Sequence, residues 1–348
     1  MIAFVAPGPL TQLTGGYIYD NQIVEGFRRL GRRVIVKGVS ERFPTPAARD
    51  LREAADVLES IPDGTVTIVD GLAAGAMPRQ IEHEAGRLRF IALVHHPLAH
   101  ETGVSKRDAT RLWAHETFTL HHVRHVVVTS PRTARLLTRE YGVKRRRISC
   151  IEPGTDRRPL NRGTGRNSLL CVATLTPRKG HVTLIRALAR AARLDWHLTC
   201  LGSLDRDPVT VRRVRDEIRK GGLAQRVTLA GETASRARLQ RYYDEADVFV
   251  LPTEYEGYGM AVAEALASGL PVVSTPTGAI PQLVGRDAGI LVPSGDVTAL
   301  ANALTRVLDD GKVRAKLRAG ARRRRSALRT WTQTVREFAA VVRKVERT

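Results

Sequence analysis

Two carboxylates frame a glycine-containing turn in the segment EGYGMAVAEALAS, where Glu256 and Glu264 stand eight residues apart. An apolar run, DVFVLPT, precedes the turn, and a helical pattern that ends near Gly269 follows it. The start of a helix offers unpaired backbone N–H groups and a positive dipole end, which together favour an anion such as a diphosphate. A carboxylate can accept hydrogen bonds from two hydroxyls of a ribose or a sugar ring. The segment therefore predicts a site for both phosphate and sugar, with Glu264 suited to a ribose and Glu256 to a sugar hydroxyl.

Two other interpretations of these glutamates stay open. Glu256 could be an acid that favours the start of a helix through the dipole, and Glu264 could be an exposed helical residue. A carboxylate pair for glycoside hydrolysis is less favoured. Eight helical residues span about 12 Å, whereas the carboxyl groups of such a pair lie roughly 5–9.5 Å apart.

A second segment, TLTPRKGHVTLIRALAR, places Arg178, Lys179 and Gly180 directly after one strand pattern and before a helical pattern. Cations at the carboxyl end of a strand can bind a diphosphate. A merely solvated pair would be poorly placed, because cations at the start of a helix oppose its dipole. We therefore favour a ligand-binding role for Arg178 and Lys179.

His95 follows another strand pattern, FIALV. An imidazole there could ligate a metal, transfer a proton or donate a hydrogen bond to a sugar. His96 is its neighbour, but no third metal ligand accompanies the two histidines, so we favour contact of His95 with a substrate, with a structural imidazole as the alternative. Gly15 and Gly16, after the first strand pattern, permit close approach of a ligand to the backbone, although a plain loop explains them almost as well.

Asp205 and Asp207 have a spacing that can hold a divalent cation beside a diphosphate. They occupy an expected surface loop before a helix. This position favours capping of the helix and solvation over metal binding.

Composition points to an ordinary water-soluble globular protein, with 43% hydrophobic and 26% charged residues in 348. The apolar runs are far shorter than the ~18 residues of a membrane span. The N-terminal run has no basic segment before it and ends at Pro7, so it predicts a strand rather than a secretory signal. Three cysteines without C-x-x-C spacing favour neither a disulfide framework nor structural zinc, and a reducing cytoplasm is the simplest location.

The formal net charge is +21, and the densest basic runs are residues 144–147 and 322–325. A solvated surface is the favoured interpretation, followed by contact with an anionic membrane or lipid surface. Nucleic acid is least favoured, because aromatic residues are only 5% of the chain and no binding module is visible. If 322–325 is helical, its four arginines point almost all the way round the helix and form no single stripe.

Short apolar runs alternate with helical patterns along the chain, which is typical of βαβ units and parallel sheets. We expect an α/β fold with two Rossmann-like domains, 1–160 and 161–330, that face each other across a cleft, joined through an irregular linker at 155–167. The closing segment spaces apolar residues on one helical face, so we expect a helix within 331–348 that docks on the N-terminal domain. Twelve strands are expected, at 2–6, 32–38, 65–70, 90–96, 125–130, 148–154, 168–174, 196–202, 226–231, 247–253, 271–275 and 289–293.

Together these elements resemble the retaining glycosyltransferases of family 4, which have the GT-B fold. The most specific part is EGYGMAVAEALASGLPVVST with its E-x7-E pattern, supported by PRKGHVTLIRALA, by PGTD, by the early GG and by the histidine at a strand end. The resemblance covers nearly the whole chain in order.

The resemblance implies roles for individual residues. Glu264 matches the glutamate that binds the donor ribose, and Glu256 matches the one near the donor sugar. Lys179 matches the lysine that steadies the leaving diphosphate, Gly16 the glycine near the phosphates, and His95 the histidine near the transferred sugar. The expected catalytic residues are then Lys179, Arg178, His95 and Glu256, and the expected donor-binding residues are Gly16, Glu264, Gly257, Tyr258, Gly259 and Met260.

The sequence departs from the family at two positions. The family usually has an arginine five residues before the lysine, where this chain has Thr174, and Arg178 could supply the missing guanidinium. Gln282 stands where a glutamate is common.

The resemblance implies metal-independent transfer of a hexose, without a cofactor, from a nucleotide diphosphate sugar to a hydroxyl acceptor of a glycan, a glycolipid or a natural product. A UDP-sugar is favoured over a GDP-sugar on family breadth alone. The alternative is a non-catalytic partner protein that binds a nucleotide sugar. The expected location is the cytoplasm, with peripheral contact at an anionic inner membrane face and no nucleic-acid partner.

Overall fold

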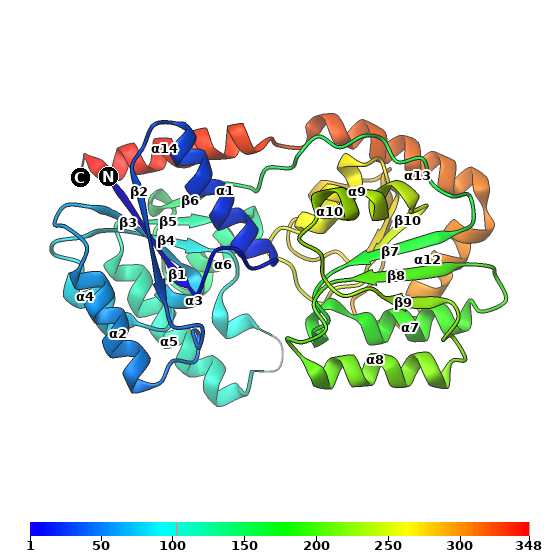
Figure 1. Ribbon diagram of the computed structural model, residues 1–348, viewed down its shortest axis with the longest axis horizontal. Coiled ribbons are helices and arrows are strands. Elements are labelled where there is room, and N and C mark those ends of the chain that lie inside the picture. The colour runs from blue at the N-terminus through cyan, green and yellow to red at the C-terminus, as the bar shows by residue number, and fades with distance from the viewer. Residues whose placement is uncertain (102–103, 348) are drawn as a thin grey trace. The chain divides into compact units, whose positions relative to one another are not determined.

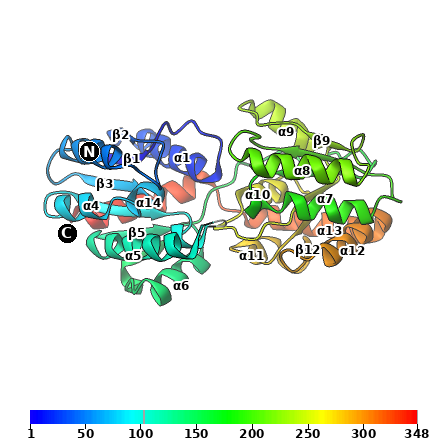
Figure 2. The ribbon, with the colours of Figure 1, turned by 90° about the horizontal axis from the view of Figure 1, so that it is seen from below.

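The computed structural model describes residues 1–101 and 104–347, and its helices and strands are shown in Figures 1 and 2. The chain forms two compact units, Met1–Gly154 with Trp331–Thr348, and Thr155–Thr330. Each unit contains one six-stranded parallel sheet. All twelve predicted strands form, and the predicted α/β class with two Rossmann-like domains is confirmed.

The sheet of the first unit has the order β2-β1-β3-β4-β5-β6. Its strands are almost continuous apolar runs, as expected for a parallel sheet covered on both faces; β1, β3 and β5 are buried at every residue. The strands are β1 (Ile2–Pro7), β2 (Val34–Val39), β3 (Val66–Asp70), β4 (Arg89–Val94), β5 (His125–Val128) and β6 (Ile148–Cys150).

Helices cover both faces of this sheet. Figure 1 shows α1 and α14 on one face and α2, α4 and α5 on the other. The helical segments of this unit are α1 (Gly15–Arg29), α2 (Ala48–Glu59), α3 (Gly71–Ala74), α4 (Pro78–Glu84), η1 (Leu98–His100), α5 (Lys106–His122), α6 (Pro131–Glu140), η2 (Arg145–Arg147) and α14 (Trp331–Glu346).

The closing helix α14 lies beside α1 in the first unit, although the two helices come from opposite ends of the chain (Figure 1). The predicted apolar face is buried: Val335 is 4% exposed, and Phe338 and Val342 are fully buried. Phe338 meets Phe27 of α1 edge to face, with ring centroids 5.7 Å apart. Gly26 of α1 lies so close to Val335 that a Cβ atom there would come within 2.2 Å of it.

The sheet of the second unit has the order β12-β11-β10-β7-β8-β9. Chain order runs outward from β7 in one direction and from β10 in the other, so the strand order reverses between these two neighbours. In open α/β sheets such a switch point is where ligands bind. The strands are β7 (Ser168–Val172), β8 (His197–Leu201), β9 (Val227–Leu229), β10 (Val248–Leu251), β11 (Val272–Ser274) and β12 (Gly289–Leu291).

The helices of the second unit also pack on two sides. Helices α7, α8 and α12 lie side by side, while α13 packs against α10 and α11. The helical segments are η3 (Pro177–Lys179), α7 (His181–Arg190), α8 (Pro208–Lys220), α9 (Arg236–Glu245), α10 (Met260–Ala267), α11 (Ile280–Val284), α12 (Val297–Asp309), α13 (Gly311–Arg324) and η4 (Arg325–Ala327).

The segment 155–167 is irregular, as expected for a linker, but it packs on the second unit instead of standing free. Asn161 is only 3% exposed. Its backbone N–H donates to the carbonyl of Ser268 at 2.8 Å, and its side-chain amide donates to the carbonyl of Ala246 at 2.9 Å. These buried polar contacts make the segment part of the second unit.

The arginine run 322–325 spans the end of α13, at Arg324, and the start of η4, at Arg325. Arg323 pairs with Asp287 at 2.7 Å, and Arg325 donates to the carbonyl of Arg158. Across the part of the chain that the structure describes, no helix has the length and apolar character needed to cross a bilayer.

Candidate functional site

The loops that follow β7 and β10 are tied to each other at the switch point of the second sheet. The carbonyl of Arg178 accepts hydrogen bonds from the backbone N–H of Glu254 at 2.7 Å and from the hydroxyl of Thr253 at 3.0 Å. Gly180 adopts a left-handed conformation with φ 72°. A Cβ atom at Gly180 would lie 2.1 Å from the carbonyl oxygen of Pro252, so only glycine permits this approach.

This connection brings Lys179, Arg178 and Glu256 together. The ammonium of Lys179 pairs directly with the carboxylate of Glu256. The guanidinium of Arg178 lies 3.9 Å from the same carboxylate and donates to the carbonyl of Tyr255 at 2.7 Å. Glu256 is 8% exposed. Burial alone would raise its pKa, but the charges of Lys179 and Arg178 hold the pKa of Glu256 below its usual value.

The turn after Glu256 leads into α10 with the geometry expected for anion binding. Gly259 precedes the helix with φ 97°, and no described side chain caps the helix start. The first backbone N–H groups of an α-helix have no partner inside the helix. Tyr258 is 5% exposed, and Met260 begins the helix. Gly257, Tyr258, Gly259 and Met260 thus form a turn and helix start that can hold a phosphate through the backbone.

Gly278 supports this turn from the loop after β11. A Cβ atom at Gly278 would lie 1.9 Å from the carbonyl oxygen of Glu256 and 2.8 Å from that of Gly257. Its φ of 55° lies in the region that glycine adopts most readily. The close backbone contact therefore positions the turn that carries Glu256.

Glu264 lies on α10 within a second group of contacts. The hydroxyl of Tyr243 donates to Oε2 of Glu264 at 2.8 Å, and Arg158 lies 3.5 Å from Oε1. Arg158 also stacks over the Tyr243 ring, 4.8 Å from its centroid. Burial and the charge of Glu264 raise the pKa of Tyr243 well above its usual value, so this hydroxyl stays protonated and acts as a donor. Glu264 is thus a fixed carboxylate rather than an exposed helical residue.

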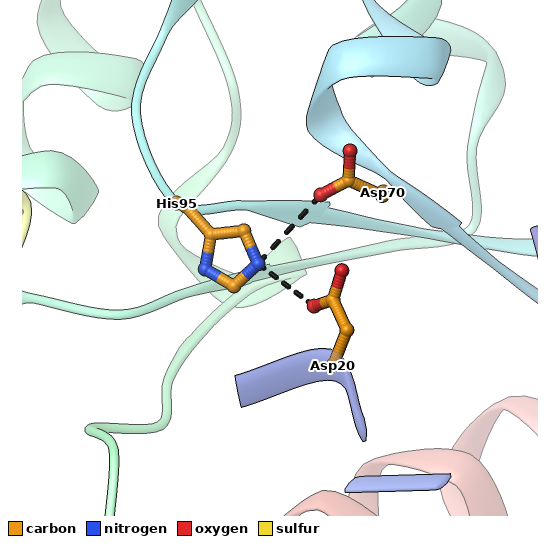
Figure 3. A group of neighbouring side chains, drawn as sticks. All are labelled: Asp20, Asp70 and His95. Atoms are coloured by element: carbon orange, nitrogen blue, oxygen red, sulfur yellow. Dashed lines mark hydrogen bonds and ion pairs between the residues drawn. The ribbon is translucent and has the colours of Figure 1, made fainter. Parts of the chain in front are cut away.

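His95 lies in the first unit, just after β4, beside two buried aspartates (Figure 3). Its Nε2 is 2.8 Å from Oδ1 of Asp20 on α1 and 3.6 Å from Oδ2 of Asp70 at the end of β3. Burial lowers the pKa of His95, but the two carboxylates more than compensate and leave it above its usual value. Burial and the charge of Asp20 raise the pKa of Asp70 to about 7.

Gly16 lies against this histidine. A Cβ atom at Gly16 would be 3.3 Å from Cδ2 of His95, tighter than an ordinary contact. The early glycine predicted to lie near phosphates thus allows α1 to approach the imidazole ring.

Among the described residues, one group of side chains has metal-ligand atoms within 4.8 Å of one another, namely Asp20, Asp70 and His95. Two carboxylate oxygens and an imidazole nitrogen form a donor set that divalent cations accept. The 2.8 Å contact between His95 and Asp20 is equally the distance of a charge-assisted hydrogen bond. The sequence expectation of a metal-free enzyme did not anticipate this group.

The structure thus places the predicted site residues in three groups. Lys179, Arg178, Glu256 and the turn 257–260 lie together, Glu264 lies further along the same helix α10, and His95 and Gly16 touch each other in the first unit. Sequence reasoning missed four partners of these residues. Asp70 carried a signal, since it is the last residue of a predicted strand, whereas Asp20, Arg158 and Tyr243 carried none.

Three secondary expectations can be compared with the geometry. Asp207 accepts a hydrogen bond from the backbone N–H of Thr210 at 2.8 Å, so it caps α8 as expected. Arg178, which was expected to supply the guanidinium missing at Thr174, lies 3.9 Å from the carboxylate of Glu256. Gln282 is exposed on α11.

Comparison with known proteins gives family matches in both units. Residues 15–158 match the family described as Glycosyltransferase Family 4, and residues 166–310 match that described as Glycosyl transferases group 1. An MMP alpha-(1->4)-mannosyltransferase of Mycolicibacterium hassiacum is 26% identical over 319 residues, which cover 87% of this chain and 76% of the relative. The lipopolysaccharide core biosynthesis mannosyltransferase LpsB of Rhizobium meliloti is 24% identical, covering 99% of this chain and 98% of the relative.

Solved structures show the same fold. Sucrose-phosphate synthase from Thermosynechococcus elongatus superposes with a TM-score of 0.82 at 22% identity, covering 99% of each chain. HepE of Anabaena, solved with UDP and glucose, superposes with a TM-score of 0.77 at 16% identity, covering 98% of each chain. Taken with the matches in both units, these findings show that the chain belongs to the family 4 glycosyltransferases of GT-B fold and is an enzyme of sugar transfer.

Proposed function

We propose that this enzyme transfers a hexose from a nucleotide diphosphate sugar to a hydroxyl acceptor, with retention at the anomeric carbon and without a metal ion. The observation that carries the proposal is the group of Lys179, Arg178 and Glu256 beside the start of α10, at the switch point of the second sheet. Cations, backbone N–H groups and a carboxylate together suit a ligand that is anionic at one end and rich in hydroxyls at the other.

The chemistry required is stabilisation of a leaving diphosphate. As the bond between the sugar and the diphosphate breaks, negative charge grows on the diphosphate oxygens. Lys179 and Arg178 supply fixed positive charge for it, and the helix dipole of α10 adds to their field. Because Glu256 already holds both cations in place, little reorganisation is needed when the charge develops.

The carboxylates have separate tasks in this proposal. Glu264, fixed by Tyr243 and Arg158, accepts from the ribose hydroxyls of the donor. Glu256 accepts from a hydroxyl of the donor sugar while it balances the charge of Lys179. His95, which matches the histidine that the family has near the transferred sugar, is proposed to contact the donor sugar.

We propose a class of donor, a nucleotide diphosphate sugar, and not a particular compound. The sequence favours a UDP-sugar, with a GDP-sugar second. The name of one relative, a phosphatidylinositol monomannoside mannosyltransferase of Corynebacterium glutamicum that is 31% identical over 172 residues, specifies GDP-mannose. Both nucleotides are therefore tested together. We further propose a cytoplasmic enzyme, with a solvated surface as the first interpretation of the basic runs at 144–147 and 322–325 and peripheral contact with an anionic membrane or lipid-linked acceptor as the second.

Calorimetric titration with UDP, GDP and ADP tests the donor site directly. We expect tight binding of one nucleotide by the full chain, and loss of most of that affinity in Glu264→Ala. Glu232→Ala, at an exposed glutamate of the same unit, serves as the matched control and should bind normally. Failure of all three nucleotides to bind would refute the proposed donor class.

The stereochemical part needs a second measurement. Once calorimetry has identified the nucleotide, its α-linked sugar donor is incubated with candidate hydroxyl acceptors, and the product is analysed by proton NMR. An α-linked product would support retention, and a β-linked product would refute it.

A further inference from the structure

The buried carboxylates beside His95 determine which of its nitrogens can meet a substrate. Nε2 lies 2.8 Å from Oδ1 of Asp20 and 3.6 Å from Oδ2 of Asp70. Both carboxylates are almost fully buried, with 1% and 4% of their side chains exposed. A carboxylate at this distance accepts a hydrogen bond, so the proton is held on Nε2.

Nδ1 is on the opposite side of the imidazole ring. In Figure 3 it points away from both aspartates, while Nε2 points between them. The His95 side chain is 21% exposed, unlike its two partners. Any ligand that reaches the ring while these contacts persist must therefore meet Nδ1 or the adjacent carbon.

The ring is also held against rotation. Tyr19 contacts it edge to face, with centroids 5.2 Å apart and an angle of 78° between the planes. Gly16 approaches its Cδ2 edge so closely that a Cβ atom would lie at 3.3 Å. A flip of the ring would exchange Nε2 for a carbon and break the contacts with Asp20 and Asp70.

We propose that Asp20 and Asp70 are positioning residues that hold a proton on Nε2 of His95, so that the ring presents Nδ1 to a substrate oxygen. The ligand is an oxygen group of a nucleotide sugar: a sugar hydroxyl, which can donate to Nδ1 of the neutral ring, or a diphosphate oxygen, which accepts from Nδ1 of the charged ring. This inference rests on the proposed function for the identity of the substrate, but the assignment of the two nitrogens does not.

The charges around the ring favour the protonated form of His95. The groups that face His95 are Asp20 from α1 and Asp70 from β3, with Tyr19 against the ring. The net effect of the two carboxylates is a raised pKa for His95. The imidazolium, which carries protons on both nitrogens, therefore persists to higher pH than that of an isolated histidine.

Nitrogen NMR of the full chain labelled with ¹⁵N-histidine tests the assignment without any substrate. His95→Gln identifies the His95 signals. Above the His95 pKa we expect the neutral ring to keep its proton on Nε2. A neutral ring protonated on Nδ1 would overturn the inference.

Two variants test the roles of the aspartates. Asp20→Asn removes a charge while it keeps the shape of the side chain, and should lower the His95 pKa by about 1 unit or more; Asp70→Asn should lower it less, because Asp70 is further away. Asp56→Asn, at an exposed position on α2, is the matched control and should leave the His95 pKa unchanged. A His95 pKa that is unchanged in both Asp20→Asn and Asp70→Asn would overturn the proposal.

Ligand titrations then identify the oxygen. A shift of the Nδ1 signal with UDP or GDP alone would support contact with the diphosphate, and a shift only with UDP-glucose or GDP-mannose would support contact with the sugar. No shift with a nucleotide sugar that calorimetry shows to be bound would overturn the contact. Broadening of the Nε2 signal by stoichiometric Mn²⁺ would show a metal site instead of the hydrogen-bonded pair.

Measurements of kcat distinguish a failure of this inference from a failure of the proposed function. With the donor identified by calorimetry, Asp20→Asn should lower the kcat for release of the nucleoside diphosphate about tenfold or more and change the donor KM little. Normal kcat in a variant with a lowered His95 pKa would refute the positioning role while the proposed function stands. If no nucleotide binds the wild-type chain, the proposed function fails, and the NMR experiment still reports on His95.

Discussion

Lys179 and Glu256 are 77 residues apart in the sequence, yet their side chains form an ion pair that joins the loops after β7 and β10. The pair exists because the strands are neighbours in the second sheet, with Val248 paired with Leu169 and Phe249 paired with Leu170. Arg178 approaches the same carboxylate, so two cations share one anion. This excess of positive charge is what a leaving diphosphate requires.

Replacement of Lys179 by alanine should lower kcat more than it weakens donor binding. The ammonium acts mainly on charge that develops during bond breaking, so we expect a loss of about 10²–10³ in kcat and a smaller change in donor affinity. Steady-state kinetics and calorimetry on Lys179→Ala measure the two quantities. Lys220→Ala, at the exposed end of α8, is the control. Equal losses in kcat and affinity would contradict a role specific to the transition state.

Tyr243→Phe should weaken nucleotide binding without unfolding the second unit. The substitution removes the hydroxyl that donates to Glu264 at 2.8 Å and retains the fully buried ring. A hydrogen bond to a charged group contributes roughly 1.5–3 kcal/mol, and we expect about a tenfold loss of nucleotide affinity because only part of that contribution concerns ligand binding. Calorimetry against Tyr242→Phe, at the partly buried neighbouring position, provides the comparison. Equal affinities in the two variants would show that Tyr243 does not position the carboxylate.

Gly278→Ala should destabilise the second unit and disturb the turn that carries Glu256. The new Cβ atom would lie 1.9 Å from the Glu256 carbonyl oxygen, in addition to the cost of φ 55°. We expect a decrease of about 2 kcal/mol or more in the free energy of unfolding, measured by urea denaturation.

Gly222→Ala separates the two causes. Gly222 has a comparable φ of 64°, but no atom lies within 4 Å of the position of its Cβ. It should therefore lose only about 1–2 kcal/mol from backbone conformation. A loss in Gly278→Ala no larger than that in Gly222→Ala would exclude the predicted clash.

Glu116→Gln should reduce the pH dependence of stability in the first unit. Burial raises the pKa of Glu116 from its usual 4.5 to about 7, despite hydrogen bonds from the backbone N–H groups of Leu98 and Ala99 and from the hydroxyl of Tyr141. A carboxyl group with a raised pKa stabilises the fold below its unfolded pKa, and this stability is lost as pH rises through the folded pKa.

The loss should therefore fall between about pH 4.5 and 7, the unfolded and folded values for Glu116, and should be on the order of 3 kcal/mol in the wild type. Urea denaturation across this pH range measures it. Asp20 and Asp70 contribute in the same direction, because their pKa values are also raised from 3.8, so the variant should retain part of the slope; the raised pKa of His95 adds a loss only above about pH 6.5. An unchanged slope in Glu116→Gln would contradict the raised pKa.

The sequence was sufficient to predict the strands and the residues that follow them. Parallel strands buried on both faces must be nearly continuous apolar runs, and such runs are visible in the sequence. The turn EGYG and the segment PRKG were recognisable because glycine and charge at the end of a strand are uncommon unless they serve a turn or a ligand.

The partners of the site residues were not predictable in the same way. Asp20 is an ordinary acid within an amphipathic helix, and only the packing of α1 against the end of β4 brings it to His95. Tyr243 and Arg158 likewise reach Glu264 only through tertiary packing. The segment that carries Arg158 is held in place by contacts distant in sequence, such as that of Asn161 with Ala246, which are 85 residues apart. The sequence predicted an irregular linker at 155–167 but not its packing on the second unit, which depends on these contacts.

Taken by itself, the sequence determined the order and type of the elements and the chemistry available at their ends, because local periodicity and turn residues act over a few positions of the chain. Tertiary structure alone decided which charges meet. It paired Lys179 with Glu256, fixed Glu264 with Tyr243, and buried Asp20 and Asp70 beside His95. The strength and pKa of an ionisable group depend on burial and on charges a few ångströms away, and those distances exist only once the sheets and helices have packed.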